Sequence, residues 1–380
     1  MDKVLHIVEP TLESEAGHCH SFVESFCSGR GKSGSTVFLY AGRHARLPRL
    51  EKMGVRVFPY FRRRIRRPQA FLLYRRLLRE PGRIFLPTAT RIDLALLSLA
   101  AGGPIPPGKA VLYFHWFRPD AKKRNFLGRM ARRQPNVGVL GPTDSVVRIF
   151  RECGFGYVVT VPYPITPVPS DGQSEDAAFR HLLFAGAARF DKGFPDVVNL
   201  VAWLNAQRRT LPVSIQASPD HYDRHDPRVQ AEIDRLERIG YPHLTVRAET
   251  LRGREYPEQF QGAICLQPYD PGDFADRVSG VTLDALSHGC PVVTLRGTWM
   301  GRVVERFEAG KVVDEATPQR MLAGVEEILR DYGCYRRNAL HAGSVLQQEL
   351  SASRLFEIVT TGTIPRRAWE PLIVVPSQPS

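Results

Sequence analysis

Short runs of apolar residues alternate with longer amphipathic stretches along most of this chain. In the first part, apolar runs predict strands at Val4–Val8, Val37–Tyr40, Val55–Pro59, Ile84–Pro87, Val111–His115 and Val137–Gly141. Apolar residues at helical spacing predict helices between them, including His20–Ser28, Ala70–Arg79 and Ser145–Cys153. Alternation of this kind is typical of parallel sheets built from β-α units.

A proline-rich break divides this pattern into two parts. Residues 162–178 contain four prolines followed by Ser170-Asp171-Gly172, which is typical of a linker. Beyond it we predict strands at Leu182–Ala185, Val213–Ala217, Leu244–Arg247, Ala263–Gln267 and Pro291–Leu295, and helices at Phe194–Asn205, Arg228–Ile239, Val281–His288 and Pro318–Leu329. We therefore predict an α/β protein with two Rossmann-like, doubly wound domains that face each other across a cleft. The predicted parts are residues 1–165, a linker at 166–178, a second domain at 179–355 and a partly loose segment at 356–380.

The positive charge is concentrated in the first predicted domain. The whole chain carries a formal charge of +13, but residues 1–165 hold 28 Lys and Arg against 11 Asp and Glu, leaving 24 against 28 for the rest. A basic half favours a polyanionic partner: a membrane surface, an acidic lipid-linked molecule or nucleic acid.

Metal and secretion signals are weak. The six cysteines form no C-x-x-C pair, so we predict no zinc site and a reducing compartment. His221 and His225 have helical spacing in an acidic run, but a solvated loop or helix start is the favoured interpretation. The strand at Val4–Val8 is too short for a signal peptide, and Leu94–Ala101 is too short to span a bilayer. We therefore expect a cytoplasmic protein without a metal ion.

One loop of the second part combines a glycine with two cations. Gly186 follows the strand at Leu182–Ala185, and Arg189 and Lys192 precede the next helix. A glycine at a strand exit lets the backbone approach a ligand, and cations beside the first amides of a helix can neutralise a diphosphate. The alternative is a surface loop with two solvated cations.

A second loop adds polar groups suited to a nucleotide. Ser279-Gly280 would open the helix at Val281–His288 and offer amides to phosphate oxygens. Asp284 lies one turn inside this helix, where its carboxylate can accept two hydrogen bonds from a vicinal diol such as ribose. The alternative for Asp284 is an exposed helix acid.

The stretch Leu182–Val313 resembles the donor half of GT-B glycosyltransferases of the retaining family-4 type. In that family a strand is followed by a glycine, an Arg and a Lys-Gly before a helix, then by two acids separated by seven residues and by Gly-x-Pro-Val-Val. The matching residues are Gly186, Arg189, Lys192, Gly193, Asp276, Asp284, Gly289 and Pro291. Two departures are Ala187, where the common form has Arg, and Asp in place of Glu at both acid positions. A variant of the family places its Arg as Arg189 stands, and has a Tyr and an Arg before the second motif, for which Tyr269 and Arg277 are candidates.

The resemblance implies a role for each of these residues. Gly186, Arg189 and Lys192 would bind the donor diphosphate, helped by amides at Ser279, Gly280 and Val281, and Asp284 would bind the ribose. Asp276 would act at the donor sugar, although its shorter side chain leaves Asp273 as the alternative. The substrate would be a UDP- or GDP-linked sugar, and no cofactor is implied.

The first domain offers histidines at the predicted cleft. Gly17 and His18 precede His20 at a helix start, where a small-residue loop faces the donor phosphates and the acceptor in the family it resembles. We predict that His20, or less favourably His18, contacts a ligand; a packed or helix-capping histidine is the equal alternative. His115 ends a strand, and we predict that it donates a hydrogen bond to the donor sugar or assists proton transfer. Thr143 and Ser145 are weaker candidates that can simply cap a helix.

We therefore predict a glycosyltransferase that retains the anomeric configuration and acts on a glycan or lipid-linked acceptor. Arginines interleaved with Phe, Leu and Tyr over residues 61–79 predict contact with an anionic membrane, hence a peripheral position at its inner face. The equal alternative is a solvated helix whose leucines pack on the sheet, and both can hold at once. The alternatives are a DNA- or protein-modifying glycosyltransferase, with nucleic acid as the less favoured partner, and a non-enzymatic partner in glycan assembly that keeps the fold. A dinucleotide oxidoreductase is disfavoured because no G-x-G-x-x-G follows the first strand.

Overall fold

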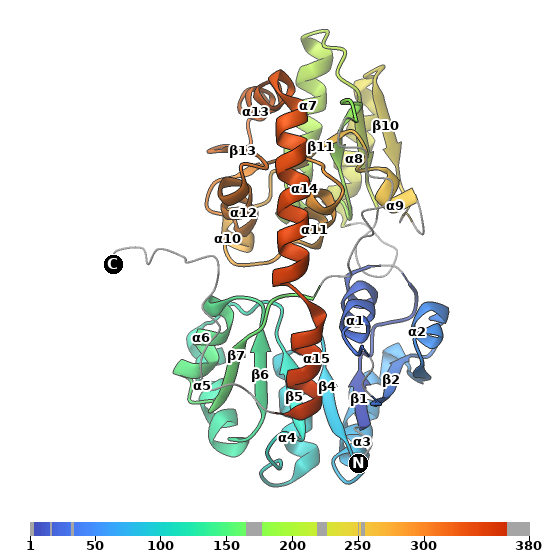
Figure 1. The fold of residues 1–380 in the computed structure, drawn as a ribbon, viewed down its shortest axis with the longest axis vertical. Helices are drawn as coiled ribbons and strands as arrows, with labels where there is room; N and C mark the ends of the chain where they lie inside the picture. The colour runs from blue at the N-terminus through green and yellow to red at the C-terminus, as the bar shows by residue number, and fades with distance from the viewer. Residues whose placement is uncertain are drawn as a thin grey trace. The chain divides into compact units, whose positions relative to one another are not determined.

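The computed structural model describes residues 4–15, 17–31, 34–164, 177–218, 226–249, 251 and 255–362. The chain divides into two compact units (Figure 1). The first comprises Met1–Thr166 and Glu349–Ser380, and the second comprises Pro167–Gln348. Most of the predicted linker at 166–178 lies outside the described residues.

The first unit contains a seven-stranded parallel sheet. Its strand order is β3-β2-β1-β4-β5-β6-β7. The strands are β1 (Val4–Val8), β2 (Thr36–Gly42), β3 (Val55–Phe61), β4 (Arg83–Leu86), β5 (Ala110–Tyr113), β6 (Gly138–Gly141) and β7 (Tyr157–Thr160). The order reverses direction between β1 and β4, and this reversal leaves room for a ligand at the carboxyl ends of those strands.

Helices cover both faces of this sheet, because each face carries an apolar cluster. The helices of the first unit are α1 (His18–Ser28), α2 (Pro48–Lys52), η1 (Arg63–Ile65), α3 (Arg66–Leu77), α4 (Arg91–Ala101), α5 (Ala121–Arg133), α6 (Asp144–Glu152) and α15 (Ala352–Thr361). One cluster includes Leu73 of α3 and Leu94 of α4, and the other includes Phe22 of α1 and Leu355 of α15.

The last helix among the described residues, α15, is an integral part of the first unit. In Figure 1, α15 lies beside β4, and it also packs against α1. Leu355 and Val359 are fully buried, and the rings of Phe26 and Phe356 lie 5.2 Å apart. The boundary therefore differs from the sequence expectation, which assigned residues up to 355 to the second domain and left 356–380 as a separate segment. Residues 363–380 lie outside the described part.

The second unit contains a six-stranded parallel sheet of order β10-β9-β8-β11-β12-β13. The strands are β8 (His181–Phe184), β9 (Val213–Gln216), β10 (Leu244–Arg247), β11 (Ala263–Gln267), β12 (Val292–Leu295) and β13 (Gly310–Val313). The helices are η2 (Phe190–Lys192), α7 (Phe194–Ala206), α8 (Pro227–Ile239), α9 (Glu255–Glu258), α10 (Pro271–Phe274), α11 (Gly280–Ser287), α12 (Trp299–Phe307), α13 (Pro318–Arg330) and α14 (Tyr332–Glu349). Here the strand order reverses between β8 and β11, so the loops after these two strands flank the expected ligand position.

Candidate active site

The loop after β8 begins at a glycine whose backbone conformation other residues rarely adopt. Gly186 has φ +97°, a conformation that side chains disfavour, and its amide donates to the Gln216 side-chain oxygen over 3.0 Å. Gln216 is buried at the end of the neighbouring strand β9, so it fixes the direction in which the chain leaves the sheet.

This glycine joins the two motifs that the sequence analysis singled out. A methyl group in place of the Gly186 hydrogen would lie 3.3 Å from Lys192 Nζ and 3.5 Å from Val281 Cγ2. The cation after β8 and the amino-terminal end of α11 therefore meet at the bare Cα of Gly186. The structure thus brings together Gly186, Lys192 and Val281.

Lys192 is held in place by a second glycine. Gly193 has φ +67°, and any Cβ there would lie 2.1 Å from the carbonyl oxygen of Pro268. The contact packs the loop after β8 against the loop after β11. Asp270 strengthens it, because its amide donates to the Asp191 carbonyl oxygen over 3.0 Å.

Arg189 lies in a charge cluster that sequence reasoning did not include. Its Nε donates to Asp191 Oδ1 over 2.7 Å, and its Nη2 bonds the other carboxylate oxygen. Arg277 reaches the same carboxylate at 3.4 Å. Burial acts to raise the pKa of Asp191, but the hydrogen bond from Arg189 and the charges of Arg189, Arg277 and Lys192 lower it below its usual value. Three cations around one carboxylate leave a net positive charge.

The Tyr269 side chain adds a buried polar group beside these cations. Tyr269 follows β11 and is only 1% exposed, and Lys192 Nζ lies 5.6 Å from the centre of its ring. Its hydroxyl has no hydrogen-bond partner in the part of the chain that the structure describes. The Ser279 hydroxyl is close enough to lower the tyrosine pKa, although burial raises that pKa more strongly.

The amino-terminal end of α11 is open toward a ligand. The Ser279 side chain caps the helix by accepting from the Thr282 amide over 3.3 Å, and Thr282 in turn donates to Gln267 of β11. Gly280 is exposed, with nothing within 4 Å of its missing Cβ. The first amides of a helix have no acceptor inside it, so this end can bind an anion.

Asp284 is partly buried on α11, and it has a partner that the sequence did not reveal. The Tyr256 hydroxyl of α9 donates to Asp284 Oδ2 over 2.8 Å. Burial raises the pKa of Asp284, while this hydrogen bond and the charge of His288 oppose the rise. Asp284 is thus not the simple exposed acid of the alternative interpretation.

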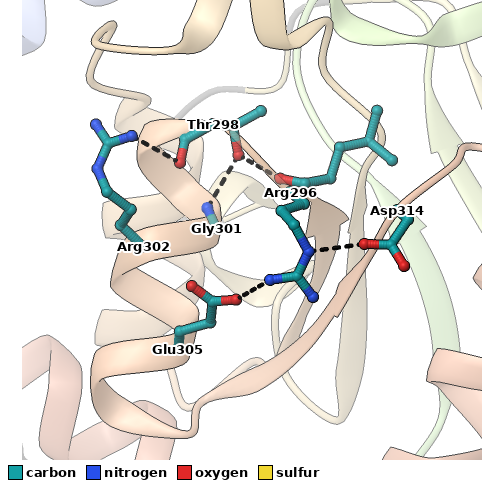
Figure 2. Close-up of polar contacts among 7 residues, drawn as sticks. Arg296, Thr298, Gly301, Arg302, Glu305 and Asp314 are labelled. Atoms are coloured by element: carbon teal, nitrogen blue, oxygen red, sulfur yellow. Dashed lines mark hydrogen bonds and ion pairs between the residues drawn. The ribbon is translucent and has the colours of Figure 1, made fainter. Parts of the chain in front are cut away.

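Asp276, the other acid of the motif, is anchored by an arginine of the neighbouring helix α12. Arg302 of α12 lies 3.2 Å from Asp276 Oδ1 and also donates to the Ala275 carbonyl oxygen. Figure 2 shows the turn that holds this arginine: Thr298 caps α12 through the Gly301 amide, and Arg302 donates back to the Thr298 carbonyl oxygen. The alternative acid, Asp273, lies on the short helix α10, and its amide donates to Asp270.

In the first unit, His115 follows β5 and is oriented by the backbone. Its Nε2 lies 2.8 Å from the Pro87 carbonyl oxygen, which can only accept. In the neutral ring Nε2 must therefore carry the proton, and Nδ1 is an acceptor. The backbone thus already uses the N–H group of a neutral His115, and a hydrogen bond from this residue to a donor sugar stays a prediction.

A buried carboxylate, which sequence reasoning missed, lies at the point of strand reversal in the first unit. Glu9 follows β1 and is 1% exposed; Thr11 donates to it over 2.6 Å, and Thr88 after β4 also bonds it. Burial raises the pKa of Glu9, and these hydrogen bonds oppose the rise. The signal was an acid directly after an apolar strand.

The predicted site residues at the start of α1 have different exposures: Gly17 and His18 are exposed, and His20 is buried. Gly17, at φ +83°, has open space around it, and the His18 ring lies 6.0 Å from the His115 ring. His20 is instead 1% exposed and lies 3.6 Å from Glu24. Burial lowers the His20 pKa, and its Nε2 has no hydrogen-bond partner among the described residues, so a ligand contact of His20 stays a prediction. Thr143 precedes α6, and its hydroxyl lies 3.0 Å from that of Ser145.

No cluster of three or more His, Cys, Asp or Glu that could hold a metal ion occurs among the described residues. His221 and His225 lie outside them. Within the same residues, no helix has both the length and the apolar character needed to cross a membrane.

No protein-family model and no curated protein matches this sequence. Solved structures do match. HepE from Anabaena in complex with UDP-glucose has a TM-score of 0.68 and 12% identity, covering 94% of this chain and 98% of that one. The chain has the GT-B fold.

Two further GT-B structures support this assignment. WaaG, a glycosyltransferase involved in lipopolysaccharide biosynthesis, has a TM-score of 0.63 and 13% identity, covering 94% of this chain and 99% of that one. Sucrose-phosphate synthase from Thermosynechococcus elongatus has a TM-score of 0.65 and 12% identity, covering 94% and 96%. At these identities the likeness concerns the fold.

Proposed function

We propose that this chain is a glycosyltransferase that uses a nucleoside diphosphate sugar as its donor. The observation that carries the proposal is the meeting of Lys192 and the start of α11 at Gly186. A cation, open helix amides and a glycine surface at one point of strand reversal suit a diphosphate. The similar fold of HepE, whose structure contains UDP-glucose, supports the same donor class.

The positive cluster would act on the leaving group. As the sugar departs, negative charge grows on the diphosphate, and fixed cations and amides stabilise that charge without reorganising. Lys192 and the α11 amides would contact it, and Arg189, oriented by Asp191, would add charge. Asp284 would bind the ribose, and Asp276, held by Arg302, would contact the donor sugar.

The stereochemical part of the proposal is retention of the anomeric configuration. The leaving phosphate would then take the acceptor proton on the face from which it departs. His115 and His18 would line the acceptor side, with Glu9 fixing the loop between β1 and α1 through Thr11. Chemical analysis of the anomeric product tests this part.

We further propose a lipid-linked glycan as acceptor and an anionic membrane as partner, at the cytoplasmic face. On α3, Leu73 and Leu77 pack in the core, whereas Leu72 is 60% exposed. Arg75 on this helix and Arg79 just beyond its end are also exposed. An exposed leucine among arginines suits a membrane surface, where each basic residue contributes about 1 kcal/mol.

The donor proposal can be tested by measuring whether UDP or GDP raises the unfolding temperature of the protein. A ligand that binds only the folded protein raises its unfolding temperature by mass action. We expect one nucleotide to do so for the wild type and to lose at least tenfold in affinity with Lys192→Met, since a charge-assisted hydrogen bond contributes about 1.5–3 kcal/mol. Lys311→Met, at a lysine of β13 paired with Glu327, is the matched control and should bind normally. Absence of any shift with both nucleotides would refute the donor proposal.

Co-sedimentation with vesicles tests the membrane proposal separately. We expect binding to phosphatidylglycerol vesicles but not to phosphatidylcholine vesicles, reduced by the paired change Leu72→Glu and Arg75→Glu. Arg238→Glu, at an exposed arginine of α8, controls for a change of charge in general. Equal binding by all variants, or binding to DNA in place of vesicles, would contradict this proposal.

A further inference from the structure

The Asp284 carboxylate is engaged on one side only. Its Oδ2 accepts the Tyr256 hydroxyl at 2.8 Å, and its Oδ1 has no hydrogen-bond partner among the described residues. The last torsion of an aspartate side chain is broad, so an isolated carboxylate samples many rotations. A hydrogen bond to one oxygen therefore restricts where the other oxygen points.

The position of Tyr256 is fixed by contacts that run through two other aromatic side chains and return to Asp284. Its ring lies edge-on to Phe260 at 5.4 Å, and Phe260 stacks on the His288 ring at 5.7 Å. His288 Nδ1 in turn lies 2.7 Å from the Asp284 carbonyl oxygen. The tyrosine and the carboxylate are thus connected both directly and through two rings, which gives the hydroxyl little freedom to turn away.

We propose that Tyr256 is a positioning residue for donor recognition: its hydroxyl fixes the Asp284 carboxylate so that the opposite oxygen meets the ribose diol of the nucleotide. This inference rests on the proposed function, because it assumes that Asp284 faces a ribose. It assigns part of donor affinity to α9, a four-residue helix that no motif marks.

The surroundings of Asp284 and Tyr256 predict how nucleotide binding should depend on pH. Burial raises the Asp284 pKa, and the Tyr256 hydrogen bond and the charge of His288 oppose that rise. Burial also raises the pKa of Tyr256, helped by Asp284, Tyr269 and Cys265, so its hydroxyl remains a donor at neutral pH. Removing the hydroxyl removes one group that lowers the Asp284 pKa. The carboxylate then protonates at higher pH, and a protonated carboxyl accepts fewer hydrogen bonds from a diol.

Calorimetry of UDP and GDP binding to wild type and Tyr256→Phe provides the test. We expect Tyr256→Phe to weaken binding of the preferred nucleotide about tenfold at neutral pH, the lower end for a hydrogen bond to a charged group. The pH below which binding weakens should move upward. The 2′,3′-dideoxy form of the same nucleotide should bind both proteins equally, because it has no diol to meet.

Two variants control this experiment. Tyr241→Phe, which removes a hydroxyl that donates to the Leu211 carbonyl oxygen, should leave nucleotide binding unchanged. Asp284→Ala should weaken binding, and adding Tyr256→Phe to it should cause no further loss, since the tyrosine acts through the carboxylate.

The outcomes separate the two proposals. Failure of the wild type to bind UDP or GDP refutes the proposed function. Binding by the wild type, with Tyr256→Phe showing the same affinity and pH dependence, overturns the role of Tyr256 alone. Equal loss for the dideoxy nucleotide also overturns it, because the effect would then not depend on the diol.

Discussion

Replacing Gly186 with alanine tests the phosphate site with a single methyl group. The new Cβ would lie 3.3 Å from Lys192 Nζ and 3.5 Å from Val281 Cγ2, so the folded chain can accommodate it with a small shift of the lysine. The cost to stability comes from φ +97°, which is unfavourable for alanine by about 1–2 kcal/mol. The protein should therefore fold, with a moderately lower unfolding temperature.

The effect on ligand binding should be larger. A phosphate oxygen accepting from Lys192 must lie about 2.7–2.9 Å from Nζ, and the methyl group would occupy part of that space. Loss of one charge-assisted hydrogen bond, about 1.5–3 kcal/mol, predicts a roughly ten- to hundredfold weaker nucleotide affinity. Isothermal titration with UDP and GDP measures it.

Gly240→Ala is the matched control. Gly240 ends α8 at φ +62° with nothing within 4 Å of its missing Cβ, so alanine there brings backbone strain without approaching the site. We expect lower stability and unchanged nucleotide affinity. If Gly186→Ala binds nucleotide as tightly as Gly240→Ala does, the bare Cα of Gly186 is not part of the phosphate site and our reasoning fails.

Three further predictions concern other parts of the structure. Gly193→Ala should lower the chemical denaturation midpoint far more than Gly186→Ala, because its Cβ would lie 2.1 Å from the Pro268 carbonyl oxygen; an unchanged midpoint would contradict this contact. Leu355→Ala should destabilise the first unit by about 2–5 kcal/mol, and hydrogen exchange should rise in α1 but not in α7; equal changes in both helices would argue against it. The pKa of Asp191 is lowered by its arginines, so its contribution to stability is present above the ordinary aspartate pKa of about 4 and is lost as pH falls through the lower folded value. The stability difference between wild type and Asp191→Asn should accordingly shrink below about pH 4, and a constant difference would refute the ion cluster.

Apolar runs predicted the strands that lie inside long alternating patterns, but two short strands were missed. β7 lies directly before a proline-rich stretch, and the prolines dominated how this region was interpreted. β13 has only two apolar residues, which follow a lysine. The place of α15 was also not predictable, since the amphipathic pattern of a helix does not say which core it joins.

The candidate site was partly predictable for a similar reason. Glycine and cations at strand ends are local signals, and they identified Gly186 and Lys192. The partners Tyr256, Asp191 and Arg302 were missed because their roles depend on contacts made in three dimensions; Tyr256 and Asp284 are 28 positions apart. His20 shows the limit of such local signals. The sequence around a histidine near a helix start does not tell whether its ring packs in the core or faces a ligand.

The position of α15 has a consequence for how the protein forms during translation. Every strand of the first sheet is synthesised before the second unit begins, yet part of its apolar surface is covered by residues that emerge only after the second unit has been made. On the ribosome, the core of the first unit therefore stays incompletely covered at Phe26, which contacts Phe356, while the second unit can finish its core. A chain that ends prematurely after α14 would then be released with the core of the second unit complete and the core of the first unit without the residues that α15 supplies.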